Sequence, residues 1–209
     1  MKRFDDSDFG LTWLMAMFHQ DWSHNGATGE EAARYHLVPD LEPEAVLAIR
    51  QDAQSLLDNL DAAEIEAVWQ AGTCPEGKFF NPRWGFTTGP VWMETLIQLC
   101  DAWLAVKPDV RPLTGESAAD GADMADAVLA EIDRTRFLPD VTRHALAECV
   151  RRCSPDLAFR LLLRAISEVG LLSGASLDPD QYARLESIGS ALQYGEFVVD
   201  NVKYLVEDE

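Results

Sequence analysis

The sequence predicts a mainly α-helical protein made of two packed helical halves. Apolar residues recur at three- and four-residue steps through most of the 209 residues, and these segments start at capping residues or prolines. All six tryptophans lie in the first half, and a stretch rich in proline, glycine and small residues follows the last of them. We therefore expect an acidic, tryptophan-rich helical domain over 1–108, a linker over 109–122 and a C-terminal helical domain over 123–209.

Two amphipathic helices are predicted before residue 61. The first starts after Asp8, which is a plausible cap, and runs toward Trp22. Its apolar positions recur at helical spacing: Leu11, Leu14, Met15 and Phe18. The second starts with Pro43 at its first position and buries one apolar stripe through Leu60.

Two more helices are expected before the predicted linker. One is opened by a capping box, with Asp61 in the serine role and Glu64 three residues later, and Gly72 ends it. The other follows Pro90 and carries two tryptophans on its apolar positions. Between them, glycines, prolines and aromatic residues predict an ordered aromatic loop or a short β-hairpin near 74–89.

The second half is helical by the same criteria. Segments around 128–132 and 141–150 place apolar residues on one face, and Val141 belongs to the second of these faces. The segment 157–169, opened by a Ser-Pro pair, is apolar almost all round, which is typical of a central buried helix. A last helix opens at Pro179, and residues 197–199 either continue it or turn extended.

Charge is the compositional feature that departs from average. A formal net charge of −19 produces a field that repels phosphate backbones and anionic lipids. We therefore expect no direct binding of nucleic acid or membrane, and a cationic protein as the natural partner. The N-terminal basic pair, Lys2 and Arg3, is followed by no apolar stretch, so the chain reads as cytoplasmic.

Motifs for chemistry are weak. The sequence carries no nucleophile elbow and no glycine-rich phosphate loop, and carboxylate pairs are too common to identify an acid–base dyad. The four cysteines form no C-x-x-C pair and are expected to be reduced. His19, Asp21 and His24 are the only cluster of metal-ligand types, with poor spacing for one site. We expect no enzymatic activity, metal or cofactor.

Acidic residues are concentrated in one segment. Between Asp5 and Glu76 there are fifteen acidic side chains and two arginines, which favours a face made to meet a basic protein. Two aromatic residues are candidate anchors for such contact: Tyr35 and Trp22, although Trp22 fits a core position equally well. The candidate contact carboxylates are Asp21, Glu30, Glu31, Asp40, Glu42, Glu44, Asp52, Asp58, Asp61, Glu64 and Glu66.

The string Phe18-His19-Gln20-Asp21-Trp22, followed by Glu30-Glu31-Ala32 and the leucine-rich acidic stretch 47–60, carries a family resemblance. Over about residues 9–105, with Trp69 and Trp92, the sequence resembles the immunity proteins of bacterial contact-dependent growth inhibition systems. The resemblance implies a cytoplasmic protein that binds and blocks the C-terminal toxin domain of a cognate effector, and such toxins are often nucleases. A small helical metal-dependent enzyme using His19, Asp21 and His24, or an acidic adaptor without a toxin, are the alternatives.

Overall fold

The computed structural model describes residues 8–73, 79–85, 87–107 and 121–207, and this part of the chain is mainly helical as predicted. Its α-helices are α1 (Leu11–Ala16), α2 (Gly29–His36), α3 (Pro43–Asn59), α4 (Ala62–Ala71), α5 (Gly89–Leu104), α6 (Ala125–Arg134), α7 (Asp140–Arg152), α8 (Pro155–Ser173), α9 (Pro179–Ala191) and α10 (Glu196–Asp200). Short 3₁₀ helices are η1 (Trp22–His24), η2 (Pro82–Trp84), η3 (Ala122–Met124) and η4 (Lys203–Leu205). An isolated parallel bridge joins Leu177 to Val206.

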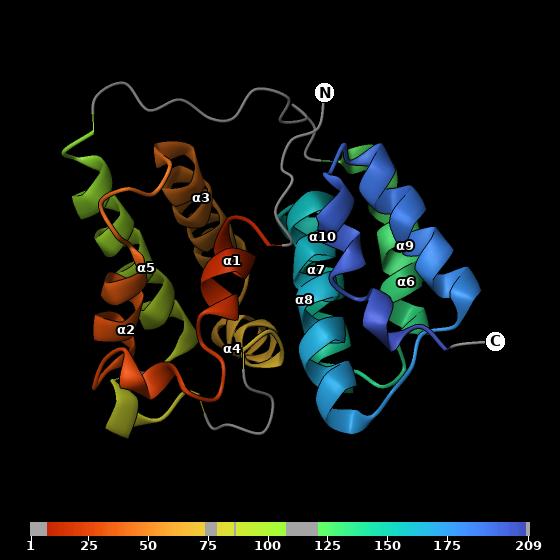
Figure 1. The fold of residues 1–209 in the computed structure, drawn as a ribbon, viewed down its shortest axis with the longest axis horizontal. Helices are drawn as coiled ribbons and strands as arrows, with labels where there is room; N and C mark the ends of the chain where they lie inside the picture. The colour runs from red at the N-terminus through yellow and green to blue at the C-terminus, as the bar shows by residue number, and fades with distance from the viewer. Residues whose placement is uncertain (1–7, 74–78, 86, 108–120, 208–209) are drawn as a thin grey trace.

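The two halves lie side by side (Figure 1). Helices α1 to α5 form one group and α6 to α10 the other, and α4 packs against α7 and α8 where the groups meet. Most of the predicted linker, 109–120, lies outside the described residues. Of its last two residues, Gly121 has a left-handed conformation with φ of 75° and Ala122 begins η3.

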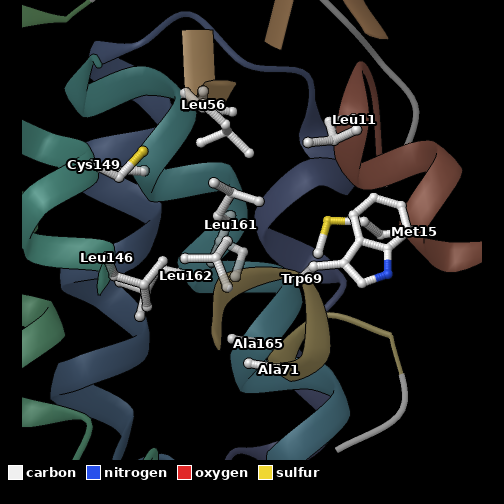
Figure 2. Packing of buried hydrophobic residues seen from close by; sticks show 14 of the residues in the cluster. Leu11, Met15, Leu56, Trp69, Ala71, Leu146, Cys149, Leu161, Leu162 and Ala165 are labelled. Carbon is white, nitrogen blue, oxygen red and sulfur yellow. The ribbon is translucent and has the colours of Figure 1, made fainter. Parts of the chain in front are cut away.

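One apolar core runs through both halves, because buried residues from each group belong to the same cluster. Figure 2 shows side chains from α1, α3, α4, α7 and α8 meeting at this seam. The labelled residues are Leu11, Met15, Leu56, Trp69, Ala71, Leu146, Cys149, Leu161, Leu162 and Ala165. Burial of apolar surface at the contact therefore stabilises both halves together.

Helix α8 is the central helix of the second half, as its apolar composition predicts. Fifteen of its residues are buried. Ser154 caps its N-terminus, because its hydroxyl accepts a hydrogen bond from the Leu157 backbone N–H. Gly174 ends it with φ of 65°, a left-handed conformation that glycine adopts at little cost.

The first helix differs from its prediction at both ends. Gly10, with φ of 62°, stands at its N-cap, and the Leu11 N–H donates to Asp52 Oδ2 at 2.8 Å, so Asp52 replaces Asp8 as the acceptor. The helix ends at Ala16, and Trp22 begins the separate helix η1. A helix missing from the prediction, α2, follows Thr28, whose hydroxyl accepts from the Glu31 N–H.

The capping box at Asp61 and Glu64 is confirmed, with both reciprocal hydrogen bonds present. The predicted loop or hairpin near 74–89 falls partly outside the described residues. In the part that is described, 79–85 and 87–89, there is a 3₁₀ turn and no strand. Phe79 is buried against Phe18, Trp69 and other rings, so these residues match the aromatic-loop alternative.

Two expectations for the second half are wrong. Val141, predicted to face the core, is 67% exposed, because α7 packs through Thr142, Ala145 and Leu146. Residues 197–199 neither extend α9 nor form a strand. Helix α9 ends at Ala191, Gln193 takes a positive φ of 62°, and 196–200 form the separate helix α10.

Candidate functional site

Asp52 is not available to a partner, contrary to the sequence prediction. It is 8% exposed, and its two carboxylate oxygens accept hydrogen bonds from Arg160 of α8 at 2.7 and 2.8 Å. The same side chain also accepts from the Leu11 N–H. Burial removes a carboxylate from water, so the bidentate arginine offsets a cost that would otherwise be large. Asp52 therefore joins the two halves.

Glu64 is likewise an internal group and not a contact residue. It is 8% exposed, it forms an ion pair with Arg152 of α7, and it accepts from the Asp61 N–H in the capping box. Asp61 is exposed, but one of its oxygens accepts from the Glu64 N–H at 2.9 Å. These two predicted site residues stabilise the start of α4 and its packing on α7.

Trp22 occupies a core position and does not act as an exposed anchor. It is 8% exposed and lies 5.6 Å from Phe18 between ring centroids. The family-like string from Phe18 to Trp22 thus turns both aromatic rings inward and leaves His19, Gln20 and Asp21 exposed. Tyr35, in contrast, is 61% exposed on α2, as an anchor requires.

Four further predicted contact carboxylates, of which Glu66 is half-buried and the others are exposed, already have local partners. Glu30 pairs with Arg34 at 2.7 Å, and Glu31 accepts from the Ala27 N–H at 2.8 Å. Asp58 accepts from Gln54 at 2.9 Å, and Glu66 accepts from the Gly89 N–H at 3.0 Å. These groups cap or brace helices. They keep their charge, but their side chains are held by the fold.

Asp40, Glu42 and Glu44 form a distinct set, which we call the 40–44 carboxylates. Asp40 and Glu42 lie in the connection from α2 to α3, and Glu44 lies in the first turn of α3, which starts at Pro43 (Figure 1). Asp40 and Glu42 are exposed and Glu44 is half-buried. Within the described residues none of the three is engaged in an ion pair or a side-chain hydrogen bond. Of the predicted contact carboxylates, Asp21 shares this property, but only Asp40, Glu42 and Glu44 lie together within five residues of the chain.

An apolar pocket of about 170 Å³ lies beside the 40–44 carboxylates. We call it the Glu42 pocket, and its lining residues are Asp8, Phe9, Gly10, Trp13, Leu41, Glu42, Ala45 and Ile49. Helix α1 supplies the tryptophan and α3 supplies the alanine and isoleucine. The sequence did not identify this pocket, because its walls come from segments about 30 residues apart.

The second acidic side chain of the Glu42 pocket is Asp8, and its carboxylate has partners inside the protein. Arg164 Nη1 lies 3.6 Å from Asp8 Oδ2, and Asn201 donates to the same oxygen at 3.3 Å. Burial raises the pKa of Asp8, against the lowering effect of Arg164. Glu42 is therefore the pocket's available anionic group.

A second hollow lies between α4 and α7. It has a volume of about 320 Å³, and its lining includes Glu64, Asp140, exposed Val141 and His144. Two of its acidic groups form ion pairs, Glu64 with Arg152 and Asp140 with Arg143, and the third, Asp61, accepts a hydrogen bond from the Glu64 N–H. The hollow therefore presents mixed charge, in contrast to the Glu42 pocket.

The structure does not assemble the predicted metal-ligand types. His19, Asp21 and His24 are exposed, and the Asp21 N–H donates to His19 Nδ1 at 3.3 Å. Across the described ranges, no three histidine, cysteine, aspartate or glutamate side chains are grouped to hold a metal ion. A nearby histidine, His36, contacts Asn25 instead, and burial lowers its pKa.

Sequence reasoning missed a buried charged network on α8. Arg160 binds Asp52, and it also contacts Asp156, whose Oδ1 accepts from Tyr194 at 2.8 Å. Arg164 donates to the Gly72 carbonyl at 2.9 Å. The sequence did carry a signal for this network, because buried arginines on an otherwise apolar helix need partners that compensate their charge. The network links α8 to α3 through Asp52, and to Phe9, whose carbonyl accepts a hydrogen bond from Arg160 at 3.3 Å.

Alkylation should distinguish the three cysteines that the structure describes, Cys100, Cys149 and Cys153. Cys153 is half-buried, and its hydrogen bond with Cys149 lowers its pKa, whereas the pKa of Cys149 is raised and that of buried Cys100 rises to about 12. Because the thiolate is the reactive form, iodoacetamide should modify Cys153 about 10-fold or more faster than Cys149 or Cys100. Peptide mass spectrometry of timed samples measures this, with urea-unfolded protein as the control. Equal rates in the folded protein would contradict this assignment.

Comparisons with known proteins add no assignment: no family model, no curated protein and no solved structure matches the chain. Among the described helices, none combines the length and the apolar character that crossing a bilayer requires. The 40–44 carboxylates and the pocket beside them are therefore the features of this chain from which a function can be proposed.

Proposed function

We propose that this protein is an immunity protein that neutralises a basic toxin domain by binding it, without chemistry of its own. The observation that carries the proposal is the 40–44 carboxylates beside the apolar Glu42 pocket, with no cationic partner among the described residues. Protein interfaces combine a desolvated apolar centre with a polar rim, and this surface offers both. The resemblance around Phe18 to Trp22 is what suggests an immunity protein rather than another acidic binding protein.

The mechanism we propose is occlusion. A nuclease needs a cationic groove for its polyanionic substrate, and an acidic surface is attracted to that groove. The net charge of −19 speeds encounter over a distance, and the carboxylates facing the groove then exclude the nucleic acid. Under this proposal the protein acts in the cytoplasm, where a delivered toxin reaches its substrate.

Mixing the protein with the C-terminal domain encoded by the adjacent open reading frame tests this proposal. We expect a stable complex by size-exclusion chromatography, and toxin activity that falls in proportion to the complex formed. Tight binding with undiminished toxin activity would reject the occlusion mechanism but would keep the toxin domain as the binding partner. Absence of binding, or a neighbouring gene with no toxin domain, would reject the immunity function and favour the acidic adaptor.

A further inference from the structure

We propose that the Glu42 pocket receives an arginine side chain from the protein's partner. The identification of that partner as a toxin rests on the proposed function, but the chemistry of the pocket does not. The evidence is the combination of a small apolar cavity, a half-buried tryptophan and an available carboxylate in one place.

The pocket fits the aliphatic part of a long side chain. Its walls include buried Phe9 and Ile49 and half-buried Leu41 and Ala45. A volume of about 170 Å³ accommodates one side chain and excludes a helix or a folded segment. Because arginine and lysine carry methylene stems beneath their charges, both bury such stems along apolar walls while the charged group stays at the rim.

Trp13 favours a guanidinium over an ammonium group. It is half-buried in the pocket wall and makes no ring contact with another aromatic or cationic group in the described chain. The other aromatic wall, Phe9, already has the guanidinium carbon of Arg160 at 4.6 Å from its ring centroid. A planar, weakly hydrated guanidinium stacks on an indole face better than a compact ammonium does.

The carboxylates around the pocket favour a positively charged side chain as its occupant. Glu42 lines the pocket, and Asp40 and Glu44 lie within two residues of it on the chain. An anionic side chain would face repulsion from all three, and a neutral one would leave Glu42 without a charge-assisted partner. Arginine offers parallel N–H donors to a carboxylate, so Glu42 supplies both attraction and orientation.

The first test needs no protein partner. We would titrate the protein with N-acetyl-arginine amide and follow the indole N–H signals by NMR, with Trp13 assigned from a Trp13→Phe variant. We expect a saturable shift of the Trp13 signal at millimolar concentrations, a several-fold weaker effect from N-acetyl-lysine amide, and none from the neutral citrulline analogue. Equal shifts from arginine and citrulline compounds would overturn the proposal.

Variants locate the binding. Ala45→Phe fills the pocket and should weaken arginine-amide binding at least about 10-fold, and Glu42→Gln should weaken it by a similar factor. The matched control is Ala102→Phe, on the exposed face of α5. Thermal melting confirms that each variant is folded. Unchanged binding by a folded Ala45→Phe protein would place the arginine elsewhere and overturn the proposal.

Binding of the same variants to the toxin domain tests the arginine pocket and the proposed function separately. If wild-type protein binds the toxin domain and Ala45→Phe weakens that affinity about 10-fold or more while Ala102→Phe does not, the pocket holds a partner anchor. If both variants bind like wild type, the arginine pocket is wrong and the immunity function stands. If wild type binds no toxin domain, the immunity function is wrong, and the arginine-amide titration still decides the pocket's chemistry.

Discussion

Replacing Arg160 by methionine is expected to lower the free energy of unfolding by about 3–5 kcal/mol, since breaking a buried ion pair leaves an uncompensated charge. Arg160 is buried and binds both oxygens of Asp52, and it also contacts Asp156. Removing the guanidinium leaves two carboxylates in the seam between the halves. Urea unfolding followed by circular dichroism measures the change.

Two controls separate this effect from general loss of an arginine. Arg151→Met removes an exposed pair with Glu148, and it should cost less than about 1 kcal/mol. Adding Asp52→Asn and Asp156→Asn to Arg160→Met should recover much of the lost stability, because the uncompensated charges are gone. A loss below about 1 kcal/mol for Arg160→Met would show that the network does not hold the seam.

Neutralising the 40–44 carboxylates should have the largest effect on binding. The variant Asp40→Asn, Glu42→Gln, Glu44→Gln should associate with the basic partner about 10- to 100-fold more slowly at low salt, because clustered charge steers encounter. Stopped-flow fluorescence measures the rate. The folded core should be unaffected, since these side chains are engaged in no described ion pair or side-chain hydrogen bond.

The matched control removes the same number of charges from the other half. Asp123, Asp180 and Glu196 are exposed, at η3 and at the first turns of α9 and α10. Their joint replacement by amides changes the net charge equally. If this control slows association as much as the 40–44 variant does, then total charge and not the proposed surface governs the encounter.

The fold was predictable where local chemistry decides it. Capping at Asp61 and Ser154 and the continuous apolar pattern of α8 identified those helices from neighbouring residues alone. The start of α1 was not predictable, because its acceptor is Asp52, 41 residues away. Helix α2 had a readable signal, Thr28 followed by Glu31, but it buries mainly small residues and lacks a strong apolar stripe.

The sequence named the acidic residues of the proposed site but could not tell which of them the fold leaves without partners. The acidic segment identified Asp40, Glu42 and Glu44, which the structure leaves without ion pairs within the described chain. It also named Asp52 and Glu64, whose arginine partners lie 108 and 88 residues away. Composition does not record which carboxylates the fold uses internally. That distinction depends on tertiary packing, as does the pocket between α1 and α3.

The most direct test of the central claim is the rate of association with the toxin domain as a function of salt. Between about 0.05 and 0.5 M salt, screening shortens the range of the field, so the association rate should fall at least about 10-fold while the dissociation rate changes far less. That outcome would support recognition of a basic surface by an acidic one. An association rate that stays constant over this range would contradict it.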